Sequence, residues 1–287
     1  MTLRVAVVGA GRMGQGIALA LSRSGASVSL LGRGGKPVVP PLTLQTDRWA
    51  ESCVPAEVIL IAVPDAAIAE VADRLLHEKA VHRGQAVLHL SGLLDRTALR
   101  VLAPTGAALG SFHPLQTVAE PKTAAERLRG AYAGVEGEPE ALRAGERLAA
   151  MLGMTAVEIP PGAKAAYHVG ATLVANYSVA LVAMAARLAE EAGIPAEAAG
   201  RLYLPLLHGA ADNLDRLGPA AALTGAIRRG DLGTITAHLS ALAPGDRVLY
   251  AALGREALAL ARTAGLAEDA AKEVERVLSG EISDRRS

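Results

Sequence analysis

The sequence predicts an α/β protein with a doubly wound, mostly parallel sheet, followed by an all-helical second domain. A glycine-rich turn ends the first strand-like run, and strand-like and helical stretches then alternate as far as residue 159. From residue 163 onward there are only alanine-rich helical segments, separated by glycine and proline. We therefore expect a nucleotide-binding domain at residues 1–159 and a helical domain at residues 160–287.

The first strand and the turn after it form a dinucleotide-binding motif. The apolar run Arg4–Val8 leads into a GxGxxG turn, a helical stretch follows to Arg23, and a second strand-like run covers Ala26–Leu31. In such a turn the glycines allow the sharp bend, the approach of a pyrophosphate and close helix packing. The motif predicts a Rossmann domain with the cofactor phosphates at the start of the helix, and the residues expected there are Gly9, Gly11, Arg12, Met13 and Gly14.

The residues after the second strand favour NADP over NAD. An NAD site places an acidic residue there for the ribose 2′-hydroxyl, but no Asp or Glu occurs from Val28 to Thr46. Arg33 occupies the position instead, and we expect it to bind a 2′-phosphate together with Arg12. The alternative is a pair of solvated arginines beside an NAD site.

Further strand-like runs complete the predicted sheet. They cover Leu42–Gln45, Val58–Val63, Ala86–Leu90, Ala107–Phe112, Ala131–Val135 and Thr155–Ile159. The segment Pro160-Pro161-Gly162 then breaks the pattern, and the polar tail Glu281–Ser287 is expected to fray.

Composition excludes several other functions. The chain has 287 residues, 51% of them hydrophobic, and can bury a sizeable core. Its formal net charge is zero and its aromatic content is 2%, so we expect no nucleic-acid partner. The single cysteine, Cys53, rules out an internal disulfide and fits a reducing, cytoplasmic location. The histidines show no metal-ligand spacing, so no metal is predicted.

Several polar residues follow the predicted strands, at the sheet edge where ligands bind in such folds. Val63, Pro64 and Asp65 follow one strand and Ser91 follows the next, and we expect them to border the nicotinamide and its ribose. Asp65 and Ser91 could equally be ordinary helix caps. His113 stands on the next loop, where an imidazole could act as acid, base or substrate-orienting group, or be a structural histidine.

A long apolar helix is predicted from Ala163 to Ala192. Its stretch Val169–Ala186 carries no charge, but polar residues interrupt it and no other segment supports membrane insertion, so no membrane partner is expected. A helix this apolar instead predicts burial on several sides, and hence a homodimer through the helical domain.

Four polar residues form a stripe on this helix at successive steps of four, namely Lys164, His168, Thr172 and Asn176. Only Lys164 and His168 are close enough to serve one reacting group, since Asn176 lies about 18 Å along the axis from Lys164. The chain has few lysines, and one here could donate a proton. The alternative is a solvated helix start above a satisfied histidine.

Together these residues resemble the superfamily of Rossmann-domain reductases with a helical C-terminal domain. It includes 6-phosphogluconate and β-hydroxyacid dehydrogenases, ketopantoate reductase, pyrroline-5-carboxylate reductase and prephenate dehydrogenase. The chain is most similar to a bacterial branch that joins a Rossmann-like domain to a helical domain of unknown function. The matching segments are Gly9–Gly14, Ala62–Asp65, Ser111–Leu115, Tyr167-His168 with Asn176-Tyr177, Leu223–Gly225 and Arg229–Asp231.

The resemblance assigns roles to individual residues. Lys164 matches the catalytic lysine of the dehydrogenases and ketopantoate reductase, whereas His168 stands where they have asparagine. Ser111–Leu115 resembles the His-Pro loop of prephenate dehydrogenase. Substrate contacts are expected at Ser111, Asn176, Thr224 and Asp231.

The sequence thus predicts an NADPH-dependent oxidoreductase that transfers hydride to the carbonyl of a small 2-oxo acid, with ketopantoate as the leading candidate. Lys164 would protonate or polarise the carbonyl oxygen, and His113 and His168 would orient the substrate or share the proton. The alternatives are a reductase of a cyclic imine similar to pyrroline-5-carboxylate and a non-catalytic NADP-binding sensor or interaction protein.

Overall fold

The computed structural model describes residues 2–35, 37–47 and 49–280, and the tail predicted to fray, Glu281–Ser287, lies outside them. The chain divides into two compact units, Met1–Val179 and Ala180–Ser287. The predicted boundary near residue 160 marks the end of the sheet, because the last strand ends at Glu158. The boundary between the two compact units lies later, at Val179, because the first half of the long helix belongs to the unit that contains the sheet.

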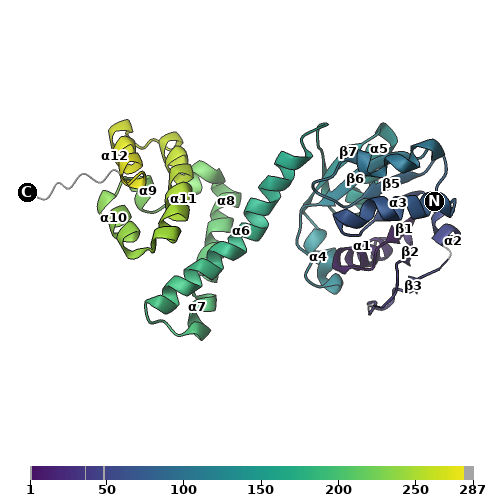
Figure 1. Ribbon diagram of the computed structural model, residues 1–287, viewed down its shortest axis with the longest axis horizontal. Coiled ribbons are helices and arrows are strands. Elements are labelled where there is room, and N and C mark those ends of the chain that lie inside the picture. The colour runs from purple at the N-terminus through teal and green to yellow at the C-terminus, as the bar shows by residue number, and fades with distance from the viewer. Residues whose placement is uncertain (1, 36, 48, 281–287) are drawn as a thin grey trace, which may run out of the picture. The chain divides into compact units, whose positions relative to one another are not determined.

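The first unit contains an eight-stranded sheet with the order β3-β2-β1-β4-β5-β6-β7-β8. Neighbouring strands are parallel except β6 and β7, which are antiparallel, so the predicted doubly wound, mostly parallel sheet is confirmed (Figure 1). The strands are β1 (Arg4–Val8), β2 (Ser27–Leu31), β3 (Leu44–Gln45), β4 (Val58–Ile61), β5 (Ala86–His89), β6 (Ala108–Pro114), β7 (Tyr132–Gly137) and β8 (Thr155–Glu158).

Each face of the sheet has its own apolar core because side chains alternate along a strand. In β1, Val5 and Val7 join one core, and Ala6 and Val8 join the other. The first core is covered by α1 (Arg12–Arg23), the short η3 (Pro121–Thr123), α4 (Ala124–Leu128) and α5 (Pro139–Leu152). The second is covered by α2 (Trp49–Cys53), η1 (Asp65–Ala67), α3 (Ile68–His77) and η2 (Arg96–Thr105).

Cys53 is a buried structural residue of the second core. Burial raises the pKa of its thiol to about 12, so the thiol is not a reactive nucleophile at neutral pH.

The predicted long helix is present as α6 (Lys164–Glu191). It is apolar but mostly exposed in the single chain; Val174, for example, is 76% exposed. Among the described residues it is the one helix long and apolar enough to cross a membrane, which is weak evidence for a span. An exposed apolar surface of this kind is typical of contacts with other proteins or with membranes.

The second unit is helical throughout its described residues, as predicted. Its helices after α6 are α7 (Ala196–Leu202), α8 (Leu204–Ala222), α9 (Ala226–Arg229), α10 (Leu232–Ala241), α11 (Pro244–Thr263) and α12 (Glu268–Leu278). A small core formed by Ile235, Leu258, Ala271, Val274 and Leu278 joins α10, α11 and α12.

Candidate active site

The glycine-rich turn between β1 and α1 is shaped to receive an anionic group. Gly9 has a φ of +126°, and a Cβ on it or on Gly14 would clash with neighbouring backbone. At Gly11, in contrast, nothing lies within 4 Å of the position that a Cβ would take. Gly11 caps α1 with no side-chain hydrogen bond, and no acidic residue occupies the first turn. The helix start is therefore open and positively polarised, as phosphate binding requires.

One cavity of about 340 Å³, which we call the glycine-turn cavity, lies in front of this turn. Its walls come from the turn, from the segments after β4 and β5, and from the end of β6. The predicted site residues Gly11, Arg12, Met13, Val63, Asp65, Ser91 and His113 all line it. The structure thus brings most of the predicted cofactor residues to the carboxyl edge of the sheet.

A second cavity of about 280 Å³, the Arg33 cavity, lies on the other side of the turn. Gly9, Gly11, Arg33 and Pro64 line it, whereas Arg12 lines only the glycine-turn cavity. The structure therefore does not bring Arg12 and Arg33 into one cavity. The second arginine of the Arg33 cavity is Arg74.

Arg74 and Trp49 also line the Arg33 cavity, and neither was predicted from the sequence as a site residue. The guanidinium carbon of Arg74 lies 3.6 Å from the centroid of the Trp49 ring, a cation–π contact. Trp49 is 3% exposed, and its Nε1 has no hydrogen-bond partner among the described residues. Both residues are far from the glycine motif in sequence, and no local signal marks them as ligand-binding.

Ser91 and Asp65 connect the segments that follow β5 and β4. The Ser91 hydroxyl donates to Asp65 Oδ2 at 2.7 Å and accepts from the backbone N–H groups of Leu93 and Leu94. Ser91 therefore does cap a turn, and in doing so it fixes the Asp65 carboxylate at the cavity wall. The two interpretations left open by the sequence, cap and site residue, are compatible here.

Lys164 lies behind the cavity wall and is 3% exposed. Its Nζ donates to the Ser91 carbonyl oxygen at 2.7 Å and to Ser111 Oγ at 3.0 Å. Burial lowers the pKa of this ammonium to about 8, opposed by the charges of Glu136, Asp65 and Asp95. Lys164 thus ties the end of β5 to β6 and places a positive charge beneath the site.

His113 lines both the glycine-turn cavity and a third one of about 840 Å³, the α6 cavity. Its Nδ1 lies 2.9 Å from the hydroxyl of Tyr167, and its ring meets that of His168 edge to face at 5.7 Å. Burial, with the charges of Lys164 and His168, lowers the pKa of His113 to about 4. The imidazole is therefore neutral at pH 7.

The α6 cavity is lined mainly by the first half of α6 and by the loop after β6. His168, Thr172 and Asn176 line it, so three of the four residues of the predicted stripe face one space, whereas Lys164 does not line this cavity. The Nδ1 atom of His168 is buried without a hydrogen-bond partner among the described residues. Gly92 borders both imidazoles, because a Cβ on Gly92 would clash with His168 and lie 2.9 Å from His113 Nε2.

The remaining predicted substrate residues fall into different settings. Ser111 is buried, and its hydroxyl oxygen accepts a hydrogen bond from Lys164 Nζ. Thr224 belongs to the second unit, where it lines a cavity of about 570 Å³ with Arg228 and Arg229. Asp231 caps α10 there by accepting from the backbone N–H and hydroxyl of Thr234. The cap gives Asp231 a structural role within its own unit.

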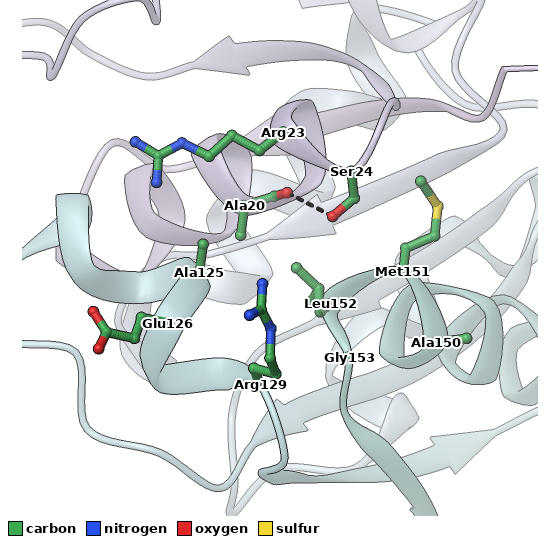
Figure 2. Close-up of a pocket in the computed structure, with 10 residues that line it drawn as sticks. All are labelled: Ala20, Arg23, Ser24, Ala125, Glu126, Arg129, Ala150, Met151, Leu152 and Gly153. Carbon is green, nitrogen blue, oxygen red and sulfur yellow. Dashed lines mark hydrogen bonds between the residues drawn. The ribbon is translucent and has the colours of Figure 1, made fainter.

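Another cavity, of about 440 Å³, lies between the carboxyl ends of α1 and α5 and helix α4 (Figure 2). Arg23, Glu126 and Arg129 line it, and the Ser24 hydroxyl donates to the Ala20 carbonyl oxygen there. It contains none of the predicted site residues.

Two family models match the chain. Residues 4–90 match the family described as NADP oxidoreductase coenzyme F420-dependent, and residues 131–257 match a domain of unknown function, DUF2520. No curated protein matches the chain.

Solved structures share its fold over nearly the full length. Protein TM1727 from Thermotoga maritima is 24% identical with a TM-score of 0.69, and the match covers 90% of this chain and 98% of that one. A candidate NADP oxidoreductase, BF3122 from Bacteroides fragilis, is 23% identical with a TM-score of 0.64, covering 92% and 98%. Pyrroline carboxylate reductase from Plasmodium falciparum, solved with NADP bound, is 11% identical with a TM-score of 0.59, covering 95% and 97%. The predicted fold is confirmed.

Proposed function

We propose that this chain, which joins a Rossmann domain of the NADP oxidoreductase type to a DUF2520 helical domain, is an NADPH-dependent reductase of a small molecule. The observation that carries the proposal is the position of His113 on the walls of both the glycine-turn cavity and the α6 cavity. A cofactor in the first and a substrate in the second would meet beside one neutral imidazole. NADPH would supply the hydride, and the protein has to supply orientation and the proton.

The residues present fit the cofactor. The open Gly11 position and the uncapped start of α1 would receive the diphosphate, beside Arg12. Arg33 and Arg74 would hold the 2′-phosphate, because a guanidinium pairs well with phosphate oxygens. The segment after β4 and Ser91 would border the nicotinamide and its ribose.

The cofactor assignment predicts a measurable preference. NADPH should bind at least tenfold more tightly than NADH, equivalent to about 1.4 kcal/mol, and Arg33→Asp should erase that preference by removing a cation and adding an acid. Isothermal titration with both cofactors measures it. Arg23→Asp, at the far end of α1, is the matched control and should leave the preference unchanged. Equal affinities in the unmodified protein would contradict the NADP assignment.

The polar cluster around His113 suits reduction of a C=O or C=N bond. Hydride adds to the carbon, and the oxygen or nitrogen takes up a proton, so the substrate gains two hydrogens. His113 is placed to hydrogen-bond the reacting oxygen or nitrogen, because it lines the cavity. Lys164 lines neither cavity and would act from behind the wall, by its charge and by holding Ser91 and Ser111.

For the substrate, we favour a neutral cyclic imine over the 2-oxo acid ketopantoate that the sequence favoured. The α6 cavity has no arginine or lysine in its lining, so a substrate carboxylate would find hydrogen bonds from Thr172 or Asn176 but no ion pair. The fold is also that of a pyrroline carboxylate reductase, whose named substrate is a cyclic imine that carries a carboxylate. This likeness supports a cyclic imine, and the preference for a neutral one rests on the cavity lining alone. No comparison supports ketopantoate.

A substrate panel ranks these candidates. Neutral cyclic imines should give a higher kcat/KM than ketopantoate and other 2-oxo acids, measured by NADPH oxidation under identical conditions. Alanine substitution at Gln116, Thr117, Thr172 and Asn176, which are polar lining residues other than the histidines and Tyr167, tests which of them recognise the substrate. A preference for ketopantoate would restore the substrate that the sequence favoured.

We also propose that the chain forms a homodimer through its helical part. Leu206 on α8 is 72% exposed, like the apolar surface of α6, and such surface needs a cover. Light scattering should give about twice the 29.4 kDa chain mass. Leu206→Glu should shift the population toward monomer, whereas Val54→Glu, at an exposed apolar residue of the Rossmann part, should not. A monomer at micromolar concentration would contradict the proposal.

A further inference from the structure

Tyr167 on α6 makes a specific contact with His113 on β6. The phenol oxygen lies 2.9 Å from His113 Nδ1, and the rings meet at right angles with centroids 5.6 Å apart. The hydroxyl reaches the imidazole because the strand residue beneath it is Gly134, which pairs with His113 in the antiparallel ladder. A Cβ on Gly134 would clash with the tyrosine hydroxyl.

The direction of this hydrogen bond depends on whether the phenol keeps its proton and on which acceptors that proton can reach. Burial raises the pKa of Tyr167 to about 12, so the hydroxyl keeps its proton. That proton has two acceptors within reach, His113 Nδ1 at 2.9 Å and the His113 carbonyl oxygen at 3.5 Å. The contact with Nδ1 has the better hydrogen-bond distance, which favours donation from Tyr167 to Nδ1.

A neutral imidazole that accepts at Nδ1 carries its hydrogen on Nε2. His113 is neutral at pH 7, because burial and the nearby charges of Lys164 and His168 lower its pKa to about 4. Its Nε2 lies beside Gly92, as does Nδ1 of His168, which has no hydrogen-bond partner in the described part of the chain. Both ring nitrogens therefore lie beside Gly92, and His113 itself lines the glycine-turn cavity and the α6 cavity.

We propose that Tyr167 is a positioning residue that holds His113 in the Nε2–H tautomer, so that His113 presents a neutral hydrogen-bond donor to the substrate. The proposal deepens the reductase assignment and rests on it for the identity of the acceptor. An imidazole held in the other tautomer would present an electron pair at Nε2 and repel a carbonyl oxygen. The Tyr167 hydroxyl thus decides whether His113 offers the substrate a hydrogen-bond donor or an electron pair that repels it.

The test reads the tautomer directly. Two-bond ¹H–¹⁵N correlation spectra of the full-length protein at pH 7, with His113 assigned by its loss in His113→Gln, should show the Nε2–H form. Tyr167→Phe should convert this signal to a mixture of tautomers or to the Nδ1–H form, and should lower kcat about tenfold or more with little change in NADPH affinity. Tyr177→Phe, at an exposed tyrosine of the same helix, is the matched control and should change neither.

Gly134→Ala is a second variant. It keeps the Tyr167 side chain, but the added methyl group displaces the phenol hydroxyl from its position. It should produce the same tautomer change as Tyr167→Phe, which keeps the test decisive if one variant folds poorly. A cationic or Nδ1–H His113 in the unmodified protein, or a tautomer unchanged in both variants, would overturn the proposal. Because the spectra need no substrate, a chain that shows the expected tautomer but reduces nothing would defeat only the reductase assignment.

Discussion

Replacing His113 by glutamine should lower kcat for the best substrate about a hundredfold or more, which is the usual range for losing a positioned acid–base group. The expected cause is loss of the imidazole on the walls of the glycine-turn and α6 cavities, because a glutamine amide can donate a hydrogen bond but cannot transfer a proton. NADPH affinity should change only a few-fold, since we propose that the phosphates bind at the turn after β1. Steady-state kinetics and cofactor titration separate the two effects. Full turnover in this variant would contradict the role given to His113.

The same variant has a predicted pH signature. His113 has a folded-state pKa of about 4 against an ordinary value of 6.5, so between these values the unfolded chain binds more protons. Its contribution to the unfolding free energy is therefore full above pH 6.5 and is lost as the pH falls toward 4. Denaturant unfolding across this range should be less pH-dependent in His113→Gln than in the unmodified protein. His89, whose pKa is also lowered by burial, titrates in both proteins and does not affect the comparison.

Replacing Lys164 by methionine should also lower kcat about a hundredfold, but for a different reason. The methionine keeps the apolar stem and removes the charge beneath the site, and it leaves the Ser91 carbonyl and Ser111 Oγ without the donor they now share. We expect NADPH affinity to fall only a few-fold. Lys122→Met, at an exposed lysine of the same unit, is the matched control. Unchanged turnover in Lys164→Met would show that this charge has no part in the reaction.

Lys164 should also affect how the unfolding free energy depends on pH above pH 8. Its folded-state pKa is about 8 against 10.5 for an ordinary lysine, so between these values the unfolded chain binds more protons. The unfolding free energy should therefore gain from Lys164 as the pH rises from 8 to 10.5. Lys164→Met should lack this rise, and a rise of equal size in the variant would contradict the burial of the ammonium.

The sequence predicted the sheet and the cofactor motif because both depend on local patterns. A strand, a glycine turn and a helix are encoded within the first residues of the chain, and each glycine meets a local steric demand. Val63, Asp65, Ser91 and His113 line one cavity, as could be expected because strand ends of a parallel sheet meet at one edge.

The sequence could not predict features that depend on contacts between distant segments. The Arg74–Trp49 pair and the His113–Tyr167 hydrogen bond each join residues from different elements, with no shared spacing. The burial of Lys164 depends on the segment after β5 and on strand β6, which both contact the start of α6. Arg12 and Arg33 seemed equivalent as neighbouring cations, but the turn directs them into separate cavities.

Hydride transfer is the step that separates the proposed reductase from a protein that only binds NADP as a sensor. The most direct measurement uses NADPH deuterated at the transferable position of the nicotinamide C4, a panel of cyclic imines, ketones and 2-oxo acids, and mass spectrometry of the products. The proposal predicts a product with one deuterium on the former C=O or C=N carbon, formed by the unmodified protein and at a much lower rate by His113→Gln. Tight NADPH binding with no deuterated product from any member of the panel would contradict the assignment and support the sensor.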